Sequence, residues 1–271
     1  MRMANIWINS LCLVLVAVAL AFGHEQWTCT PNTNTREYRE LEEKVRVFKQ
    51  QIKQLPHQQY PKDCGEIYST GTKTDGVYTI SPDKKCSFSV YCDMTNGGWT
   101  LIQRKADASV DFNRPWTDYV AGFGNLTGSH WLGLEKIHRM TKDGSRIYFE
   151  IGNYDGSRDH VSYEGFAVQG KATAYTMNVD RFGYEGTIKE LFSRHNNQKF
   201  STYDRDNDDH STTDCVGERN GAGWWYHKCS DFGDFNAVYG TKVMGGIGYW
   251  NSGFIPIKDI VIKIKEMDGH C

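Results

Sequence analysis

Residues 200–229 read FSTYDRDNDDHSTTDCVGERNGAGWWYHKC, a polar stretch that contains an acidic run, two cysteines and three adjacent aromatic residues. The stretch belongs to a longer region, residues 197–254, that has little of the periodicity of a helix or a strand. Irregular segments of this length inside a folded domain usually carry function. We therefore expect the functional site in this region.

The acidic run places carboxylates at every second position, at Asp204, Asp206 and Asp208. This spacing is typical of a loop that surrounds a hard cation with oxygen ligands, and calcium is the natural guest of such a loop. An EF-hand is excluded, because its loop requires glycine at the sixth position and glutamate at the twelfth, where this chain has Asp209 and Cys215. The alternative is a solvated acidic turn that binds nothing.

The aromatic residues follow a glycine turn between Cys215 and Cys229, which are close enough in sequence for a local disulfide. Three adjacent large rings cannot all face one core, so at least one of Trp224, Trp225 and Tyr226 should reach a surface or a pocket. Rings beside a cation loop would suit a small neutral ligand. The alternative is a ring-rich core beneath a long loop.

Residues 62–271 are predicted to form one domain of short strands and few helices, which includes the irregular region. Segments rich in β-branched and aromatic residues predict strands at 87–92, 98–104, 146–151, 161–168, 173–179 and 257–265. The predicted helices are residues 131–140 and 187–196. The domain boundary is expected near residue 61, because Pro56 and Pro61 end the preceding helix.

That preceding helix is predicted over residues 36–55, within an N-terminal segment 24–61. Apolar residues recur there at alternating steps of three and four, which is a short coiled-coil seam: Tyr38, Leu41, Val45, Phe48, Ile52 and Leu55. Fewer than three heptads are marginal alone, so we expect a homo-oligomer joined through Tyr38–Leu55 and cross-linked by Cys29. The alternative is an amphipathic helix packed on its own domain.

The first 23 residues have the features of a secretory signal peptide. Their apolar run, residues 11–22, is shorter than the roughly 20 residues of a membrane-spanning helix, which is the alternative. We therefore expect a secreted, extracellular protein without a membrane span. Loss of Cys12 with the signal leaves seven cysteines in an oxidising compartment, so at least one thiol should find an outside partner.

Two further features concern modification and function class. The sequon Asn125-Leu126-Thr127 predicts an N-glycan on Asn125, with an unused sequon as the alternative.

A net charge of −2 leaves no global positive field for nucleic acid. Because the motifs of hydrolases, zinc proteases, phosphate loops and dinucleotide-binding turns do not occur, we expect a binding protein and not an enzyme.

From Asp63 to about Met267 the chain resembles the fibrinogen-related domain of ficolins, tachylectins, angiopoietins and the fibrinogen chain ends. The segments that carry the resemblance are DCG at 63–65, GVYTI at 76–80, VYCDM at 90–94, GGWT at 97–100, GFGNL at 122–126, WLGL at 131–134, FSTYDRDND at 200–208 and WWYHKC at 224–229. The resemblance implies an α+β domain with a twisted antiparallel central sheet and a loop-rich subdomain that holds calcium and ligand.

The resemblance also assigns residues. It implies Ca²⁺ ligation by the side chains of Asp204 and Asp206 and by the main-chain carbonyls of Asp208 and His210. The disulfides it implies are Cys64–Cys92 and Cys215–Cys229. In the lectin members the peptide before the second loop cysteine is cis, and here this would be Lys228–Cys229.

We expect an acetyl-binding pocket in which the N–H groups of Cys229 and Ser230 hold the acetyl oxygen. Rings around the methyl group are expected from Trp225, Tyr226, Tyr239 and Tyr249. The expected function is a calcium-dependent pattern-recognition lectin that binds acetylated sugars, such as N-acetylglucosamine, on microbial surfaces in innate immunity. The alternative is a non-lectin ligand, angiopoietin-like or fibrinogen-like, that binds a protein receptor or polymerises.

Overall fold

The structure is a computed structural model that describes residues 36–54, 60–190, 192–218, 222–227, 229, 234–242, 247–250 and 254–267. The chain divides into two units, Met1–Gln58 and Gln59–Cys271, close to the predicted boundary at residue 61. The predicted signal peptide, Cys29, Leu55, Lys228 and Ser230 lie outside the described residues.

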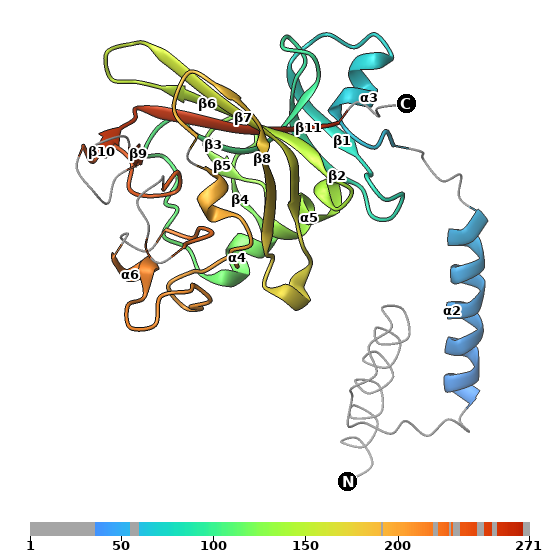
Figure 1. The fold of residues 1–271 in the computed structure, drawn as a ribbon. Helices are drawn as coiled ribbons and strands as arrows, with labels where there is room; N and C mark the ends of the chain where they lie inside the picture. Colours follow the sequence, from blue (N-terminus) through green and yellow to red (C-terminus); the bar gives the residue numbers. More distant parts are fainter. Residues whose placement is uncertain are drawn as a thin grey trace. The chain divides into compact units, whose positions relative to one another are not determined.

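In the first unit, the described residues form one helix, α2 (Arg36–Gln54), as the heptad pattern predicts (Figure 1). Ion pairs between Arg36 and Glu40 and between Glu43 and Arg46 support it along its surface. Phe48 of the seam is 63% exposed. Association of chains through this seam stays a prediction.

The second unit is built on a nine-stranded sheet in which every described pairing is antiparallel. Its main path runs β1 (Gly76–Ile80), β2 (Phe88–Asp93), β3 (Trp99–Lys105), β11 (Asp259–Glu266), β6 (Ser145–Gly152), β7 (Arg158–Val168) and β8 (Met177–Gly186). The short strands β4 (Phe123–Gly124) and β5 (His130–Trp131) branch from β3. The last strand, β11, therefore lies in the middle of the sheet and joins its two halves (Figure 1).

A few short helices and a second sheet complete the unit, which confirms the α+β class. The helices are α3 (Cys64–Ser69), α4 (Trp116–Ala121), α5 (Leu134–Thr141) and α6 (Cys215–Glu218), with 3₁₀ turns η1 (Lys171–Thr173) and η2 (Phe192–His195). The second sheet pairs β9 (Gly248–Trp250) with β10 (Phe254–Pro256). Within the described residues, no helix has the length and apolar composition that crossing a bilayer requires.

Two sequence predictions of local structure are wrong. The helix predicted at 187–196 is reduced to η2, because Phe192 packs its ring against Phe149 at 4.7 Å and against Tyr163 at 5.7 Å. Tertiary packing of single side chains thus overrides the helical pattern. The strand predicted at 173–179 starts only at Met177, because Ala174 and Tyr175 adopt left-handed backbone angles.

Both disulfides that the resemblance implies are present. Cys64–Cys92 joins α3 to β2, and Cys215–Cys229 closes the loop after the acidic run. Among the described cysteines, Cys86 is an exposed free thiol.

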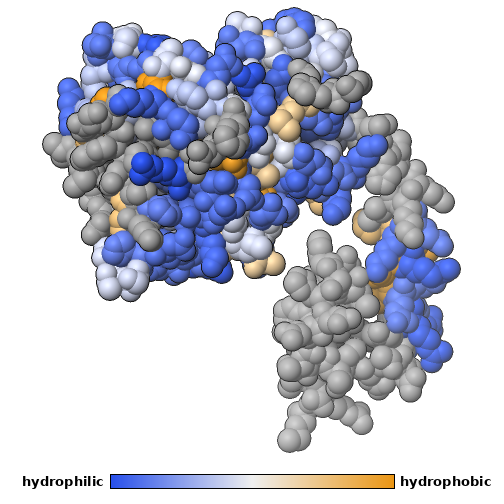
Figure 2. Space-filling model, viewed as in Figure 1, coloured by the Kyte–Doolittle hydropathy of each residue, from blue (hydrophilic) through white to orange (hydrophobic). Residues whose placement is uncertain are grey.

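The face of the molecule in Figure 2 is largely hydrophilic, with isolated hydrophobic patches.

Candidate functional site

The acidic loop is attached to the body of the domain through Asp204. Its Oδ1 atom accepts hydrogen bonds from the Trp116 main-chain N–H at 2.8 Å and from the Thr202 hydroxyl at 2.7 Å. Trp116 is the first residue of α4, so the carboxylate lies where unpaired N–H groups favour negative charge. At least one Asp204 oxygen is therefore used in holding the loop in place.

A different group of carboxylates in this loop has the geometry for a cation. Oxygen atoms of Asp206, Asp208 and Asp214 all lie within 4.8 Å of one another. Calcium binds oxygen at about 2.4 Å, so two ligands on opposite sides of one ion are about 4.8 Å apart. The spacing of these three carboxylates is therefore compatible with one calcium ion, whose binding stays a prediction, and Asp204 is not part of this group. Ligation by the predicted set of Asp204, Asp206, Asp208 and His210 stays a prediction.

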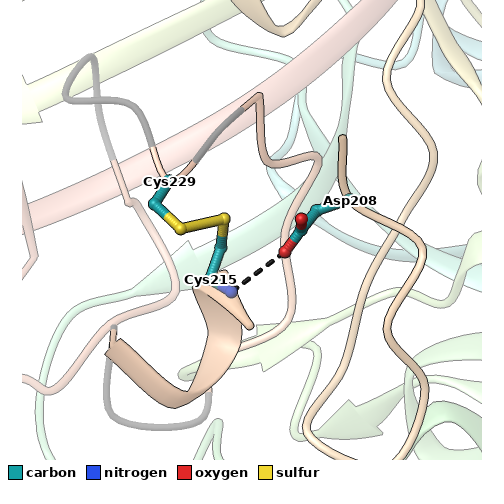
Figure 3. A group of neighbouring side chains, drawn as sticks. All are labelled: Asp208, Cys215 and Cys229. Carbon is teal, nitrogen blue, oxygen red and sulfur yellow. Dashed lines mark hydrogen bonds between the residues drawn. A yellow bond between two sulfur atoms is a disulfide. The ribbon is translucent and has the colours of Figure 1, made fainter. Parts of the chain in front are cut away.

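The acidic loop is connected to the loop disulfide through Asp208 (Figure 3). Asp208 accepts hydrogen bonds from the main-chain N–H of His210 at 2.7 Å and from that of Cys215 at 2.9 Å. Cys215 is bonded to Cys229, so neither sulfur is available as a metal ligand. Cys229 has a φ of 51°, a left-handed angle that is costly for a residue other than glycine. Asp208 therefore links the acidic loop to the disulfide that holds Cys229.

The expectation that one of the three adjacent rings reaches the surface is wrong, because all three belong to the hydrophobic core. Trp224 packs against Phe235 at 5.7 Å, whereas Trp225 packs against Phe200 at 5.0 Å. Trp224, Trp225 and Tyr226 are each 1% exposed. The ring-rich core that we set as the alternative therefore describes these three residues.

The other predicted pocket residues are divided between core and surface. Trp225 Nε1 donates to the Tyr175 carbonyl at 2.8 Å, and the Tyr226 hydroxyl donates to Asp234 at 2.7 Å. Tyr249, on β9, is 4% exposed. Tyr239 is half-buried and lines a cleft. The role of these residues in ligand binding stays a prediction.

The cleft beside Tyr239 has a volume of about 190 Å³. Its lining combines apolar groups, such as Val110, Phe112 and Val238, with the polar side chains of Lys105 and Asn236. Sequence reasoning missed Lys105, although strand alternation places it on the same face as the buried Leu101 and Gln103. It also missed Asp214, whose only signal was its position directly before Cys215.

Asn125 is exposed in the turn before β5, and its Oδ1 accepts hydrogen bonds from the main-chain N–H and the hydroxyl of Thr127. This exposure is compatible with the predicted N-glycan, which no contact of the structure tests.

The fold and the site together define a class of protein. Its members are α+β domains with a central antiparallel sheet, a disulfide-closed loop and a neighbouring acidic loop. The chain belongs to the family described as fibrinogen beta and gamma chains, C-terminal globular domain, whose model matches residues 60–266. The matches indicate no family of enzymes.

Two similar proteins extend over almost all of this chain. Fibrinogen-like protein 1 of Mus musculus is 33% identical over 307 aligned residues, which cover 94% of this chain and 96% of the relative. Angiopoietin-related protein 7 of Mus musculus is 32% identical, covering 96% of this chain and 79% of the relative.

Solved structures with a similar fold include the fibrinogen-like globe domain of human ANGPTL6. It superposes with a TM-score of 0.70 and 30% identity, covering 77% of this chain and 96% of that chain. The lamprey fibrin D-dimer, complexed with the peptide ligand Gly-His-Arg-Pro-amide, gives a TM-score of 0.69 and 25% identity, with coverages of 100% and 97%.

Proposed function

We propose that this chain is a secreted, non-enzymatic ligand of the fibrinogen-like and angiopoietin-like kind, whose globe binds a protein. Similarity to fibrinogen-like protein 1 and angiopoietin-related protein 7 over more than nine-tenths of the chain supports this function. A fibrin relative is complexed with a short peptide, which further supports peptide recognition by this fold. The apolar run at residues 11–22 supports secretion.

The observation that carries the proposal is the burial of Trp225, Tyr226 and Tyr249. An acetyl-sugar pocket needs open ring faces, whereas these rings are at most 4% exposed. The polar atoms of Trp225 and Tyr226 are also used in internal hydrogen bonds. Three of the four rings expected around an acetyl methyl therefore serve the core, which favours a protein partner over a small sugar.

Calcium has a structural role in this proposal. Asp206, Asp208 and Asp214 would hold it, and the ion would supply positive charge to three carboxylates that otherwise repel one another. Since Asp208 also accepts from the Cys215 N–H, calcium would order the loop up to the disulfide.

Association of chains would increase the avidity of the ligand. The exposed Phe48 on α2 supports a seam that a second copy covers, and Cys29 would cross-link the copies. Two linked globes that engage a surface together gain roughly 10²–10⁴ in avidity over one globe.

An acetyl-sugar lectin is the second candidate, and the half-buried Tyr239 beside a 190 Å³ cleft is the observation that favours it. Chromatography on N-acetylglucosamine resin separates the two candidates, with Tyr239→Ala as the matched variant. We expect the full mature chain and the variant to pass through alike, with and without calcium. Retention of the mature chain, with elution by free acetylated sugar or by chelator and loss in the variant, would favour the lectin.

A further inference from the structure

The cleft beside Tyr239 contains a buried charge that the proposed function does not use. Lys105, the last residue of β3, is only 2% exposed and lines this cleft. Its Nζ atom lies 3.9 Å from the centroid of the Phe112 ring and 3.2 Å from the carbonyl oxygen of Asn236, both of which also line the cleft. The ammonium group is therefore at the wall of the cleft and not in a remote part of the core.

The ammonium of Lys105 is under-compensated in the described structure. It has three N–H donors, and within the described residues its one hydrogen-bond acceptor is the Asn236 carbonyl. Among the described residues, no carboxylate oxygen lies within 4.0 Å of the Lys105 Nζ atom, the distance limit of an ion pair. A buried ammonium is costly unless it is paired, and a ring face and one carbonyl are weak compensation.

The acid–base behaviour of Lys105 reflects this environment. Burial lowers its pKa to about 8, although the negative charges of Asp234 and Asp111 act in the opposite direction. Asp111 also lines the cleft, but its Oδ1 accepts a hydrogen bond from the Asn113 main-chain N–H at 2.8 Å. At neutral pH the lysine is still mostly protonated, and a further anion would stabilise that charge.

The size and walls of the cleft limit what can enter. At about 190 Å³ the cleft is smaller than the roughly 300–1,000 Å³ of typical small-molecule sites, so it suits a small group. Val110, Val238 and Tyr239 contribute apolar groups to the lining of the cleft. A short aliphatic chain that ends in a carboxylate matches both the walls and the charge.

We propose that this cleft is a carboxylate-binding site, in which the Lys105 ammonium pairs with an acidic side chain presented by the protein partner. The choice of a protein side chain as occupant rests on the proposed function, whereas the carboxylate site rests on the geometry of Lys105 alone. The other charged or titratable groups that face the site are Asp111, Asp234 and Tyr239.

Calorimetric titration of the full mature chain with butyrate and with butyramide tests the site. The two probes have nearly the same shape and differ in charge, so we expect butyrate to bind at least about tenfold more tightly. Lys105→Met should abolish that preference. Lys136→Met is the matched control, because Lys136 is a half-buried lysine that, like Lys105, donates to main-chain carbonyls, at Ala121 and Leu132, and it lies outside the cleft.

A measurement on the unaltered chain covers the case in which Lys105→Met does not fold. Butyrate should raise the pKa of Lys105, followed through its side-chain NMR signal. Equal binding of the two probes, no binding of butyrate, or a preference that survives in folded Lys105→Met would each overturn the proposal. Absence of a receptor protein would contradict the proposed function but would leave the butyrate result unchanged, so the two failures are distinguishable.

Discussion

The main-chain N–H of Trp116 donates a hydrogen bond of 2.8 Å to the carboxylate of Asp204, across 88 positions of sequence. This contact attaches the acidic loop to the first turn of α4 and gives Asp204 a structural role. The neighbouring carboxylates, Asp206, Asp208 and Asp214, form the group with cation geometry. Asp204 therefore anchors the loop, whereas the other three carboxylates lie close enough together to share a cation.

Substitutions at Asp204 and Asp214 should separate these roles. We expect Asp204→Ala to lower the free energy of unfolding by about 1–2 kcal/mol, because two hydrogen bonds are lost. Asp214→Asn should keep the hydrogen bond that Asp214 accepts from the Val216 N–H but should weaken calcium binding about tenfold. Calorimetric calcium titration and chemical unfolding measure the two effects. Absence of calcium binding in the wild type would show that the loop is not a calcium site.

Removal of the loop disulfide should lower both the free energy of unfolding and the calcium affinity of the acidic loop. We expect the double variant Cys215→Ser, Cys229→Ser to lose about 2–5 kcal/mol of stability. Its calcium affinity should also fall, because Asp208 is held by the Cys215 N–H. Cys86→Ser, at an exposed free thiol, is the control and should change neither quantity. An unchanged calcium affinity in the double variant would argue against the coupling of loop and disulfide.

The buried His130 should make the globe sensitive to acid. Burial lowers its pKa to about 4, with a smaller contribution from Arg104, and the hydrogen bond to the Gly128 carbonyl acts in the opposite direction. As pH falls from about 6.5 to 4, the unfolded chain takes up a proton that the folded chain does not, so stability decreases by at most about 1.4 kcal/mol per pH unit. The free energy of unfolding, measured with urea at several pH values in this range, should change less steeply with pH in His130→Gln than in the wild type. Identical slopes would mean that His130 does not titrate as its burial implies.

The exposed Phe48 should be central to self-association. Phe48→Asp places a charge in the α2 seam and should convert an oligomer into monomers, without changing the melting temperature of the globe. Arg39→Asp, on the same helix but outside the seam, is the control. Sedimentation velocity at several concentrations distinguishes the species. A wild-type mature chain that is already monomeric would exclude the seam as an interface.

Local pattern is sufficient for the long central strands, since segments such as 146–151 and 257–265 alternate in the way that β6 and β11 require, but it does not predict β1, β9 or β10. The partners of buried polar groups depend on long-range contacts, and sequence patterns do not specify these. Lys105 meets Asn236 across 131 positions, and Trp225 is buried against Phe200, which is distant in sequence. The acidic loop was therefore predictable from sequence, and the Lys105 cleft was not.

The claim that the globe recognises a protein is tested most directly by binding of the labelled, full mature chain to intact cells. The cells are compared before and after treatment with protease, in the presence and absence of saturating N-acetylglucosamine. Our account predicts that protease treatment abolishes binding and that the sugar leaves it unchanged. Binding that survives protease treatment and is displaced by N-acetylglucosamine would contradict it.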